Sequence, residues 1–556
     1  MKNWKYGYST IAFLVMFLAW EVAARYVGSL VFVLPPPSRI IHELIYSHVT
    51  FSEHSAVTLE EMIGGILISL SVAFPFAWLM YLFRTARYVL QPMFLIVQCI
   101  PIFTLAPIMV IWFGWSYLAI VIPTALMIFF PLTMTIYEGL KSTPKELIDY
   151  FQVNNATTWQ TFTKLQLPFA FPQICAGLRI SAAIAGIGAV AGEWAGGQKG
   201  LGLLMLESRR SADIDTCFAA LFCLTIMSIT LFGVTVVFEK FLLRLRTKNV
   251  MVLGIGVWVA LISVFVVGWD GAAFKQRHYT LVLDWLPNPD HVPIYVGIEK
   301  KIFENYGIPL EVYKVSDPSD PLGYLTSEKA DWAVYYTPET IQARRAGANL
   351  EPVAKLIGVP LRGFIYRKGE GINKPSDLTG KVAGYSIDGT STRCIDALHA
   401  ENGIYPKKMF NIHFDLVTSL GLKKVDYTYG AFWNIECEQL KMLGVPTDYF
   451  TVEELGVPTY PELIIVSKKK GEGVDKELKA RMQAAMQECI NYCLEHPEEA
   501  FETYLSANPD KSDNTQAWEW EAWKKTIPLL ASDQVVDMGA WVSFEKWMME
   551  HKVMGD

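Results

Sequence analysis

Seven apolar stretches with almost no charge constrain this chain more than any other feature of its sequence. Each is about 20 residues long, the length that an α-helix needs to cross the hydrocarbon core of a bilayer. The predicted spans are Ser9–Tyr26, Glu61–Phe83, Leu90–Phe113, Leu118–Tyr137, Ala176–Trp194, Cys217–Phe238 and Val250–Trp269. Because six more spans follow the first, we interpret the first as a permanent anchor and not as a cleaved signal peptide.

Lysine and arginine in the short loops set the predicted orientation, because these residues gather on the cytoplasmic side. With the N-terminus in the cytoplasm, 11 of them lie in inner loops and five in outer loops. The inner ones are Lys2, Lys5, Arg84, Arg87, Lys141, Lys145, Lys164, Lys240, Arg244, Arg246 and Lys248. The outer ones are Arg25, Arg39, Lys199, Arg209 and Arg210. Since the number of spans is odd, everything after Trp269 is expected outside the cytoplasmic (inner) membrane, in the periplasm or at the outer surface.

Beyond Phe274 the apolar spans give way to short β-type runs that alternate with amphipathic helices. Predicted strands lie at 279–285, 331–336, 362–368, 381–386 and 462–470, and residues 475–496 show the 3.6-residue period of a helix. Strands alternating with helices are typical of an α/β domain, and this one is long enough for two lobes.

These patterns divide the chain into three predicted parts. Residues 1–248 form an all-α transmembrane domain, residues 249–275 contain the seventh span and a linker, and residues 276–556 form the α/β domain. Crossovers near Lys368 and Pro461 predict that lobe one comprises residues 279–368 and 462–556, and lobe two residues 369–461.

A polar interruption, Ser142–Ser181, separates the fourth and fifth spans and carries too many polar groups to cross a membrane. It resembles the coupling loop of ABC-transporter permeases, whose pattern is Glu-Ala-Ala, three residues, Gly, nine residues, then Ile-x-Leu-Pro. The matching positions are Asp149, Tyr150, Phe151, Asn155, Leu165, Leu167 and Pro168. The spacing of the pattern is kept, while the first four identities differ from it.

Most of residues 1–246 also resembles the alkanesulfonate, nitrate and thiamine-precursor branch of these permeases. The landmarks are VLPPPSRI at 33–40, IPIFTLAPIMVIWFGWS at 100–116, FFPL at 129–132 and GLG at 200–202. The resemblance implies that the loop binds an ABC ATPase subunit in the cytoplasm, and that two copies of the chain, a homodimer, form one pathway. The chain has no Gly-x-x-x-x-Gly-Lys-Ser/Thr motif, so ATP hydrolysis is expected from another polypeptide.

Prolines and one carboxylate inside the spans are features that a transport pathway can use. Pro101, Pro107, Pro123 and Pro131 fit helices that kink around such a pathway, because proline lacks a backbone donor. Glu193 is an ionisable residue at the end of an apolar span, where it either lines a pathway or makes structural hydrogen bonds. Both interpretations of Glu193 stay open at this point.

The first predicted strand of the α/β domain ends in an aspartate and a tryptophan and enters a proline-rich loop. The carboxyl edge of a sheet is where α/β lobes bind ligands. Other predicted strands also end in aromatic, amide or carboxylate side chains. The candidate ligand-binding residues are Asp284, Trp285, Asn288, His291, Tyr335, Tyr336, Tyr385, Trp433, Asn434 and Glu436.

These side chains suit an aminopyrimidine, whose flat faces can stack on aromatic rings and whose amino group can donate to an ionised carboxylate. The role of His291 stays open between a ligand contact and a histidine that holds the loop. No Cys-x-x-Cys spacing indicates a metal site, and no dense basic face indicates a nucleic-acid partner.

The α/β domain resembles type II periplasmic binding proteins. Within them it resembles the group that includes thiamine pyrimidine-precursor binding proteins and the hydroxymethylpyrimidine phosphate synthase of thiamine biosynthesis. The matching residues are Asp284, Trp285, Pro287, Asn288, His291, Tyr295, Gly297 and the run IFENYGI at 302–308. The resemblance implies that Glu436 binds the edge of the pyrimidine and that Asp284 also faces the ligand.

The leading hypothesis is an ABC importer permease fused to its own receptor for a thiamine pyrimidine precursor of the hydroxymethylpyrimidine or formylaminopyrimidine type. Importers of riboflavin or of an alkanesulfonate-like solute are alternatives, and a membrane receptor that does not transport is an alternative of another class. A synthase is the enzyme alternative. Alignment with that enzyme puts Tyr335 at its pyridoxal-phosphate lysine and Glu339 at its reactive histidine. We therefore expect no catalytic residue and no cofactor.

Overall fold

The computed structural model describes residues 2–26, 34–113, 116–210, 213–242, 278–314, 321–386, 390–469 and 476–554. Its internal contacts divide the chain into two compact units. The first unit comprises Met1–Ser47, Leu206–Phe218 and Arg277–Asp556, and the second comprises His48–Met205 and Ala219–Gln276. The segment Leu206–Phe218 therefore groups with the C-terminal α/β domain.

The N-terminal half of the chain is helical throughout its described part. Two helices fall within the first unit, α1 (Lys2–Tyr26) and α2 (Pro37–Tyr46). The helices of the second unit are α3 (His48–Leu82), α4 (Arg84–Gln98), α5 (Ile102–Phe113), α6 (Tyr117–Lys141), α7 (Lys145–Val153), α8 (Thr158–Thr161), the π-helical turn η2 (Phe162–Gln166) and α9 (Leu167–Gly196). Two further helices, α10 (Leu201–Arg210) and α11 (Ile214–Leu242), have residues in both units.

Four helical segments among the described residues are long and apolar enough to cross a membrane. They are His48–Leu82, Tyr117–Lys141, Thr158–Gly196 and Ile214–Lys240. The helices α4 and α5 add a fifth if together they count as one broken span. The first predicted span, Ser9–Tyr26, lies in α1, which is not among these segments, and the seventh, Val250–Trp269, lies outside the described residues.

The third predicted span, Leu90–Phe113, is not one straight helix. Its two parts, α4 and α5, meet at an angle of 88°. Pro101 lies at the break, where its ring prevents a continuous hydrogen-bonded helix. Length and apolar composition predicted the stretch, but they do not report where a helix bends.

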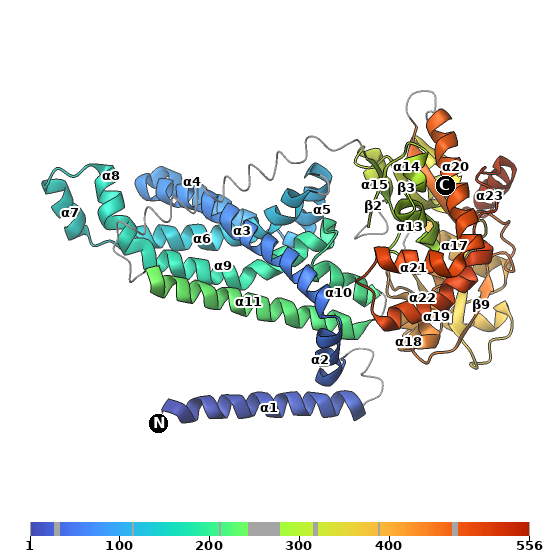
Figure 1. The fold of residues 1–556 in the computed structure, drawn as a ribbon, viewed down its shortest axis with the longest axis horizontal. Helices are drawn as coiled ribbons and strands as arrows, with labels where there is room; N and C mark the ends of the chain where they lie inside the picture. The colour runs from blue at the N-terminus through green and yellow to red at the C-terminus, as the bar shows by residue number, and fades with distance from the viewer. Residues whose placement is uncertain are drawn as a thin grey trace. The chain divides into compact units, whose positions relative to one another are not determined.

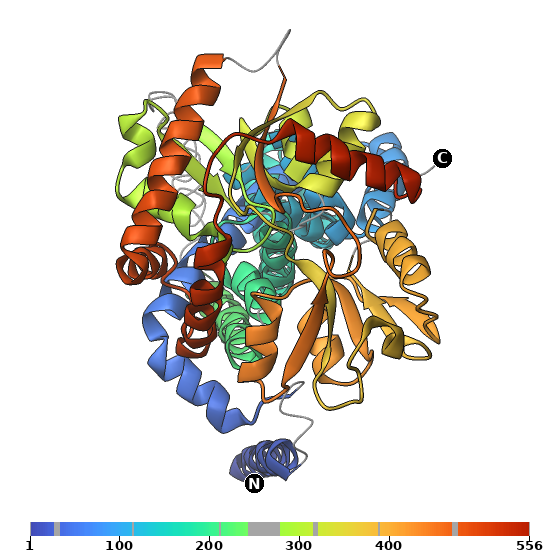
Figure 2. The ribbon, with the colours of Figure 1, turned by 90° about the vertical axis from the view of Figure 1, so that its right-hand side faces the viewer.

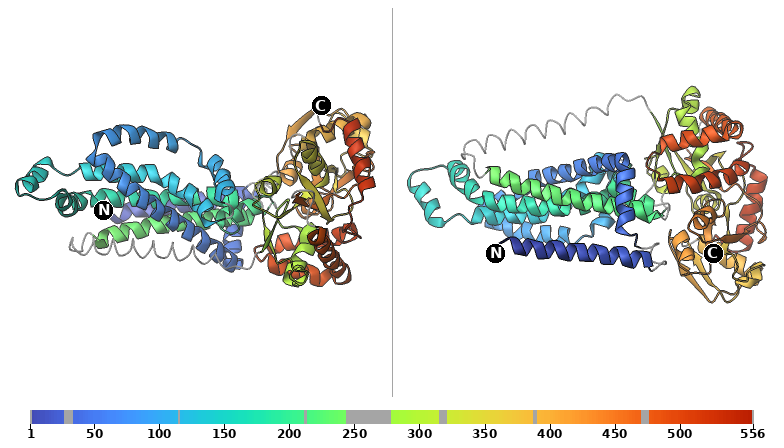
Figure 3. Two further views of the ribbon diagram at one scale, coloured as in Figure 1. Left: turned by 90° about the horizontal axis from the view of Figure 1, so that it is seen from above. Right: turned by 60° about the horizontal axis from the view of Figure 1, so that its bottom comes forward.

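Helix α6 is the centre of the second unit, because α3 and α9 both pack along it and the three lie side by side in Figures 1 and 3. Its side chains Ile128, Leu132 and Ile136 are fully buried in the core that these helices form. The short helices α7 and α8 lie together at one end of this unit (Figure 1). They belong to the polar interruption that the sequence marked as a loop outside the bilayer.

Glycines allow α9 to approach α6 closely. Gly188 and Gly192 are four residues apart and so lie on one face of the helix. A Cβ atom built on Gly188 would lie 2.6 Å from the Cα of Thr124, and one on Gly192 would lie 2.3 Å from the carbonyl oxygen of Ile120. The two backbones are therefore in contact, as in membrane helices that pack through small residues.

Glu193 makes structural hydrogen bonds. Its side chain is fully buried and accepts from the Thr58 hydroxyl at 2.7 Å, from the Gly202 amide at 2.5 Å and from the Leu203 amide at 3.1 Å. These amides open α10, where the first N–H groups of a helix have no partner inside it. Of the two interpretations that the sequence left open, the structure therefore shows the hydrogen-bonding one.

The α/β part of the first unit has two five-stranded sheets. The first has the order β2-β1-β3-β10-β4, in which β1 is parallel to β2 and β3, and β10 is antiparallel to β3 and β4. Its strands are β1 (Tyr279–Val282), β2 (Leu310–Tyr313), β3 (Trp332–Tyr336), β4 (Leu350–Lys355) and β10 (Leu463–Lys468).

The second sheet has the order β7-β6-β8-β5-β9 and repeats this pattern of directions. Its strands are β5 (Arg362–Arg367), β6 (Val382–Tyr385), β7 (Lys408–Asn411), β8 (Tyr427–Phe432) and β9 (Thr447–Thr451).

Strand β5 corrects one predicted lobe boundary. We predicted that lobe one extends to Lys368, but β5 pairs with β8 and β9 of the second sheet. The first crossover therefore lies between Lys355 and Arg362, and lobe two comprises residues 362–461. An apolar run fits either sheet equally well, so only the pairing shows which lobe it joins.

Helices cover both sheets, and Figure 2 shows the two lobes next to each other, with lobe two in yellow and orange. The predicted helix at 475–496 is confirmed as α20 (Lys476–Glu495), and all five predicted strands are confirmed. The other helices and 3₁₀ turns (η) are η3 (Pro289–His291), α13 (Val292–Glu299), α14 (Ile302–Asn305), α15 (Pro321–Thr326), α16 (Thr337–Arg345), η4 (Pro375–Leu378), α17 (Thr390–Glu401), α18 (Leu416–Gly421), α19 (Glu436–Met442), α21 (Pro497–Ala507), α22 (Asp513–Thr526), η5 (Ile527–Leu529) and α23 (Met538–Glu550).

The contact between α6 and α9 gives a stability prediction. We expect Gly192→Ala to destabilise the helical unit by about 1–3 kcal/mol, the usual cost of overpacking, because the Ile120 carbonyl is backbone and cannot move aside. This cost exceeds the gain of about 0.5–1 kcal/mol that alanine gives over glycine in a helix. Thermal unfolding of the full chain in detergent measures the change.

Gly233→Ala is the matched control, because a Cβ atom there has no neighbour within 4 Å. We expect its melting temperature to equal or exceed that of the parent protein. Equal melting temperatures for the two variants would contradict a tight α6–α9 contact.

Candidate functional site

The predicted ligand-binding residues gather at the carboxyl edges of the two sheets. In the first sheet, β1 and β3 run parallel, so Asp284, which follows β1, and Tyr336, which ends β3, lie at the same edge. In the second sheet, β6 and β8 run parallel, which places Tyr385 and Asn434 at one edge. We call these two edges, together with the loops that follow them, the site face.

His291 holds the loop that follows β1. The backbone N–H of Asn288 donates to its Nδ1 atom at 3.3 Å, so the other nitrogen, Nε2, carries the proton and donates to Asp284 Oδ1 at 2.8 Å. The Asn288 side chain accepts from the Asp290 amide at 2.9 Å and caps the short turn η3. With both ring nitrogens hydrogen-bonded inside the loop, His291 is positioned to orient Asp284.

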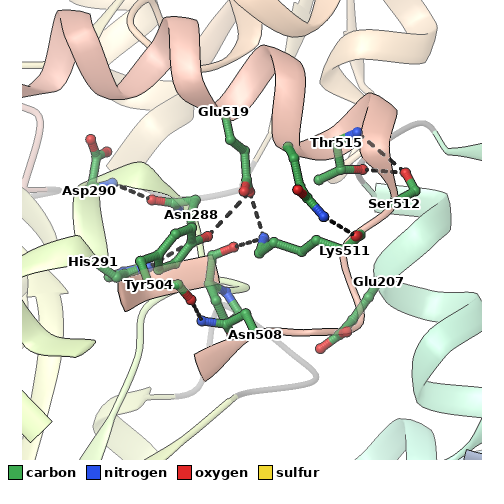
Figure 4. A network of polar contacts seen from close by, with 12 residues as sticks. Glu207, Asn288, Asp290, His291, Tyr504, Asn508, Lys511, Ser512, Thr515 and Glu519 are labelled. Atoms are coloured by element: carbon green, nitrogen blue, oxygen red, sulfur yellow. Dashed lines mark hydrogen bonds and ion pairs between the residues drawn. The ribbon is translucent and has the colours of Figure 1, made fainter. Parts of the chain in front are cut away.

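A lysine distant in sequence also fixes this loop. Lys511 donates to the Pro287 carbonyl at 2.9 Å. It also donates to Glu519 at 2.5 Å, a contact that Figure 4 shows. Glu519 is buried and also accepts from the Tyr504 hydroxyl at 3.3 Å. Burial raises the pKa of Glu519, and the Lys511 ammonium group opposes this by stabilising the charged form.

Hydrogen bonds join the two lobes across the site face. The Asn434 side-chain amide of lobe two donates to Asp290 Oδ1 and to the Thr526 hydroxyl of lobe one, each at 2.8 Å. Thr526 in turn donates to the same Asp290 oxygen at 3.0 Å. All three side chains are fully buried, and burial raises the pKa of Asp290 to about 6. The lobes are thus held together at this point.

Asp290 and Asn434 each keep one further acceptor. The second oxygen of Asp290, Oδ2, and the carbonyl oxygen of Asn434, Oδ1, are buried and have no hydrogen-bond partner among the described residues. A buried acceptor without a donor is costly, so these atoms indicate a place where a donor group of a ligand or a water molecule is needed.

Aromatic side chains from both lobes meet at the site face. The ring of Trp285 lies 5.1 Å from that of Phe414 in an edge-to-face arrangement, and the ring of Tyr336 lies 6.0 Å from that of Phe432. In each pair the first residue belongs to lobe one and the second to lobe two. Edge-to-face pairs at these distances are stabilising contacts.

The remaining predicted aromatics line the same edges. Trp433 stacks on Tyr449 with a ring separation of 5.1 Å and an interplanar angle of 12°. Tyr335 is buried next to Tyr336, with the ring centroids 5.4 Å apart, and Tyr385 ends β6. Trp433 and Tyr385 are only partly buried.

Glu436 is the first residue of α19 and the one carboxylate among the candidates on lobe two. One of its oxygens accepts from the Phe432 amide at 2.6 Å. Burial raises the pKa of Glu436 to about 8, and its hydrogen bond with Phe432 only partly opposes this shift. The carboxyl group is therefore mainly protonated at pH 7 and carries an O–H donor beside a carbonyl acceptor.

A buried arginine connects the lobes at the crossovers. Arg362, the first residue of β5, is 3% exposed and binds both oxygens of Glu339, at 2.8 and 3.0 Å. Its Nε atom lies 2.9 Å from Glu462, just before β10, and its guanidinium carbon lies 4.8 Å from the centre of the Tyr336 ring. One cation thus connects both crossover segments to a residue of the site face.

Sequence reasoning missed four residues that build the site: Asp290, Arg362, Lys511 and Glu519. Asp290 lies inside the PNPDH loop, next to predicted site residues, and could have been recognised there. Arg362 begins a predicted strand, but the apolar residues around it predicted that strand and gave no role to its own side chain. Lys511 and Glu519 carry no local signal, because their partner Pro287 lies 224 residues away from Lys511.

The described residues thus form a helical unit with segments able to span a membrane and a two-lobed α/β domain whose lobes meet at a polar and aromatic face. Residues 65–247 match the family described as binding-protein-dependent transport system inner membrane component, and residues 288–500 match the family NMT1/THI5 like. The chain belongs to both families: it is an ABC permease fused to an NMT1/THI5-like binding domain.

Relatives match the two halves separately. The formylaminopyrimidine transport permease protein ThiX of Halalkalibacterium halodurans is 35% identical over 43% of this chain and 96% of its own length. A protein of Haemophilus influenzae named for thiamine biosynthesis is 34% identical over 47% of this chain and 82% of its own length. The formylaminopyrimidine-binding protein of H. halodurans is 28% identical over 49% of this chain and 84% of its own length.

Removing the lysine in Figure 4 should loosen the loop after β1. Lys511→Met leaves Glu519 buried without a cation and removes the donor to the Pro287 carbonyl, so we expect a local destabilisation of about 3–5 kcal/mol. Hydrogen–deuterium exchange of peptides covering residues 284–291 in the full chain should become faster.

Lys524→Met is the matched control on α22, because Lys524 pairs with Glu521 at the surface, where both side chains are about half exposed. Such exposed pairs contribute about 0–1 kcal/mol. Exchange that is equally fast in both variants would show that Lys511 does not fix the loop.

Proposed function

We propose that the chain is an ABC importer permease carrying its own receptor, and that its cargo is a thiamine pyrimidine precursor of the formylaminopyrimidine or hydroxymethylpyrimidine type. The observation that carries the proposal is that the two halves of one chain resemble two parts of a transport system named for formylaminopyrimidine. A separate ATPase subunit supplies the energy.

The chemistry of the site face supports an aminopyrimidine ligand. Such a ring presents an amino donor next to a ring nitrogen that accepts. The protonated Glu436 offers an acceptor beside a donor, the complementary pattern. Trp285 and Trp433 provide flat surfaces for the faces of the ring. The sequence suggested an ionised carboxylate here, and the raised pKa changes that expectation.

Glu436 gives the sharpest test of the ligand. If its protonated form binds, affinity for formylaminopyrimidine stays constant below about pH 8 and falls above it by up to about tenfold per pH unit, because the O–H donor is lost. Glu436→Gln keeps a donor beside an acceptor, so it should bind at pH 7 within about threefold of the parent and lose the pH dependence. Glu436→Leu should lose about 1.5–3 kcal/mol. Calorimetric titration of the full chain between pH 6 and pH 10 measures both effects.

Glu453→Gln, a change at an exposed carboxylate of the same lobe, is the control and should leave affinity and its pH dependence unchanged. Equal losses in the Gln and Leu variants would show that an ionised Glu436 binds instead. Binding of riboflavin or an alkanesulfonate, with none of the aminopyrimidine, would overturn the proposed cargo.

The site does not favour the synthase alternative. Glu339, which aligns with the reactive histidine of that enzyme, gives both carboxylate oxygens to Arg362. Tyr335, which aligns with its cofactor lysine, has no amine to form a Schiff base. These two residues therefore act in packing and in the contact between the lobes.

For the ATPase, α7 is the proposed docking helix. Leu147, Tyr150 and Val153 recur every three residues on it, and the last two are 64% and 82% exposed. Apolar side chains that gather at the exposed end of a polar helix mark an interaction surface. Asp149 and Asn155 are exposed beside them, while Leu165, Leu167 and Pro168 lie where η2 meets α9 and are at least partly buried.

The same proposal sets the topology and the assembly. The N-terminus and α7 lie in the cytoplasm, the membrane is the inner one and is crossed several times, and the α/β domain faces the periplasm or the outer surface. The bias of Lys and Arg in the loops supports this orientation. Two copies of the chain surround one pathway and bind the ATPase on the cytoplasmic side.

The α7 surface gives a test that leaves ligand binding untouched. The double variant Tyr150→Ala, Val153→Ala should lower ligand-stimulated ATP hydrolysis of the complex with its ATPase by at least about tenfold, since removing interface anchors commonly costs more than 1 kcal/mol each. Ligand affinity should not change. The control is Val535→Ala, which alters an exposed apolar side chain of the α/β domain. Full stimulation in the double variant would exclude α7 as the docking helix.

A further inference from the structure

One short segment contacts both lobes of the binding domain. It consists of the end of α10, Glu207–Arg210, and the following Asp213, and it belongs to the first unit together with those lobes. On lobe one, Lys314 binds Glu207 at 3.1 Å, and the Ser512 hydroxyl donates to Asp213 at 2.6 Å. We call this segment the bridging segment.

On lobe two the bridging segment binds through an arginine. Arg209 lies 3.6 Å from the carboxylate of Asp415, which precedes α18. The segment presents an acid to a lysine on lobe one and a base to an acid on lobe two. Its charges therefore match both surfaces.

Arg210 sits where the two lobes touch. Its guanidinium carbon lies 5.5 Å from the ring centre of Trp285 and 5.6 Å from that of Phe414. Both distances are within the range of a cation–π contact. Trp285 belongs to lobe one and Phe414 to lobe two, so the cation covers a pair of rings that exists only while the lobes are together.

Opening of the lobes would remove part of these contacts. A hinge motion at the crossovers moves lobe two as a body relative to lobe one. Asp415 and Phe414 would then move away from Ser512, Lys314 and Trp285. The bridging segment is too short to stay in contact with two lobes that move apart. When the lobes open, it therefore loses its contacts with one of them.

We propose that the bridging segment is a docking surface for the closed form of the binding domain, with Arg210 recognising the closed Trp285–Phe414 pair. This rests on the proposed function for the identity of the ligand that closes the lobes. The segment runs directly into α11, whose Ile214–Lys240 stretch can cross a membrane. Closure of the receptor is thereby reported to the permease through the chain itself.

Two cysteine pairs test the proposal in the full chain in lipid nanodiscs, with exposed Cys99 changed by Cys99→Ser. The lobe-two pair is Arg209→Cys with Asp415→Cys, and the lobe-one pair is Asp213→Cys with Ser512→Cys. A short bifunctional maleimide links each pair, and formylaminopyrimidine is the probe. We expect the probe to raise the yield of the lobe-two pair at least threefold and to leave the yield of the lobe-one pair unchanged.

Binding of the probe is measured on the same samples by equilibrium dialysis. If the probe binds and the lobe-two yield does not change, the docking proposal is wrong while the proposed function stands. If neither pair can be linked under any condition, the bridging segment does not contact the domain and the proposal is also wrong.

A second arm needs no ligand. Asn434→Ala removes the hydrogen bonds that join Asn434 to Asp290 and Thr526 across the lobes. In ligand-free protein it should lower the yield of the lobe-two pair and leave the lobe-one pair unchanged. Equal yields with and without this change would overturn the proposal. If the probe fails to bind, the proposed cargo is wrong, and this arm alone decides whether the segment recognises the closed form.

Discussion

The ion pairs of Arg362 fix the place where the lobes of the binding domain meet. A guanidinium has donors in a rigid plane, which allows Arg362 to bind both oxygens of Glu339 and to approach Glu462 from the side. A buried ion pair adds little net stability, because desolvation offsets the attraction, but its geometry is demanding. Since Glu339 and Glu462 belong to lobe one and Arg362 to lobe two, this geometry holds the crossovers in register. Arg362 also contacts the ring of Tyr336, so the same guanidinium group helps to position a residue of the site face.

The sequence predicted the elements of the binding domain well and their long-range partners poorly. Alternation of apolar residues and the ends of strands are local signals, so the five strands, α20 and the position of Asp284 near the carboxyl end of β1 could be predicted directly. Pairing is not local. Strand β5 was assigned to the wrong lobe because its neighbours β8 and β9 lie more than 50 residues further along the chain. Lys511 shows the same limit for a side chain, since its contact with Pro287 depends on how α21 and α22 pack.

One position in the helical unit shows how a departure from the family pattern keeps the local shape. Asn155 stands where the permease pattern has glycine, and its φ of 55° is left-handed. Asparagine is one of the few residues that adopt this conformation at low cost, so the turn after α7 survives the replacement. The π-helical turn η2 contains Leu165 and ends at Gln166, and Leu167 and Pro168 are the first two residues of α9. A wider turn there leaves room for Pro168, which cannot donate a backbone hydrogen bond.

Fusion of receptor and permease changes what their contacts need to achieve. Two separate proteins must bind tightly enough to meet at low concentration, whereas a short flexible linker between two partners supplies an effective concentration of about millimolar. The ion pair between Arg209 and Asp415 is about half exposed on both sides, and such pairs contribute about 0–1 kcal/mol each. Contacts this weak would not hold two free proteins together. Under the proposed docking, contacts of this strength favour one arrangement of the lobes without preventing the domain from opening again.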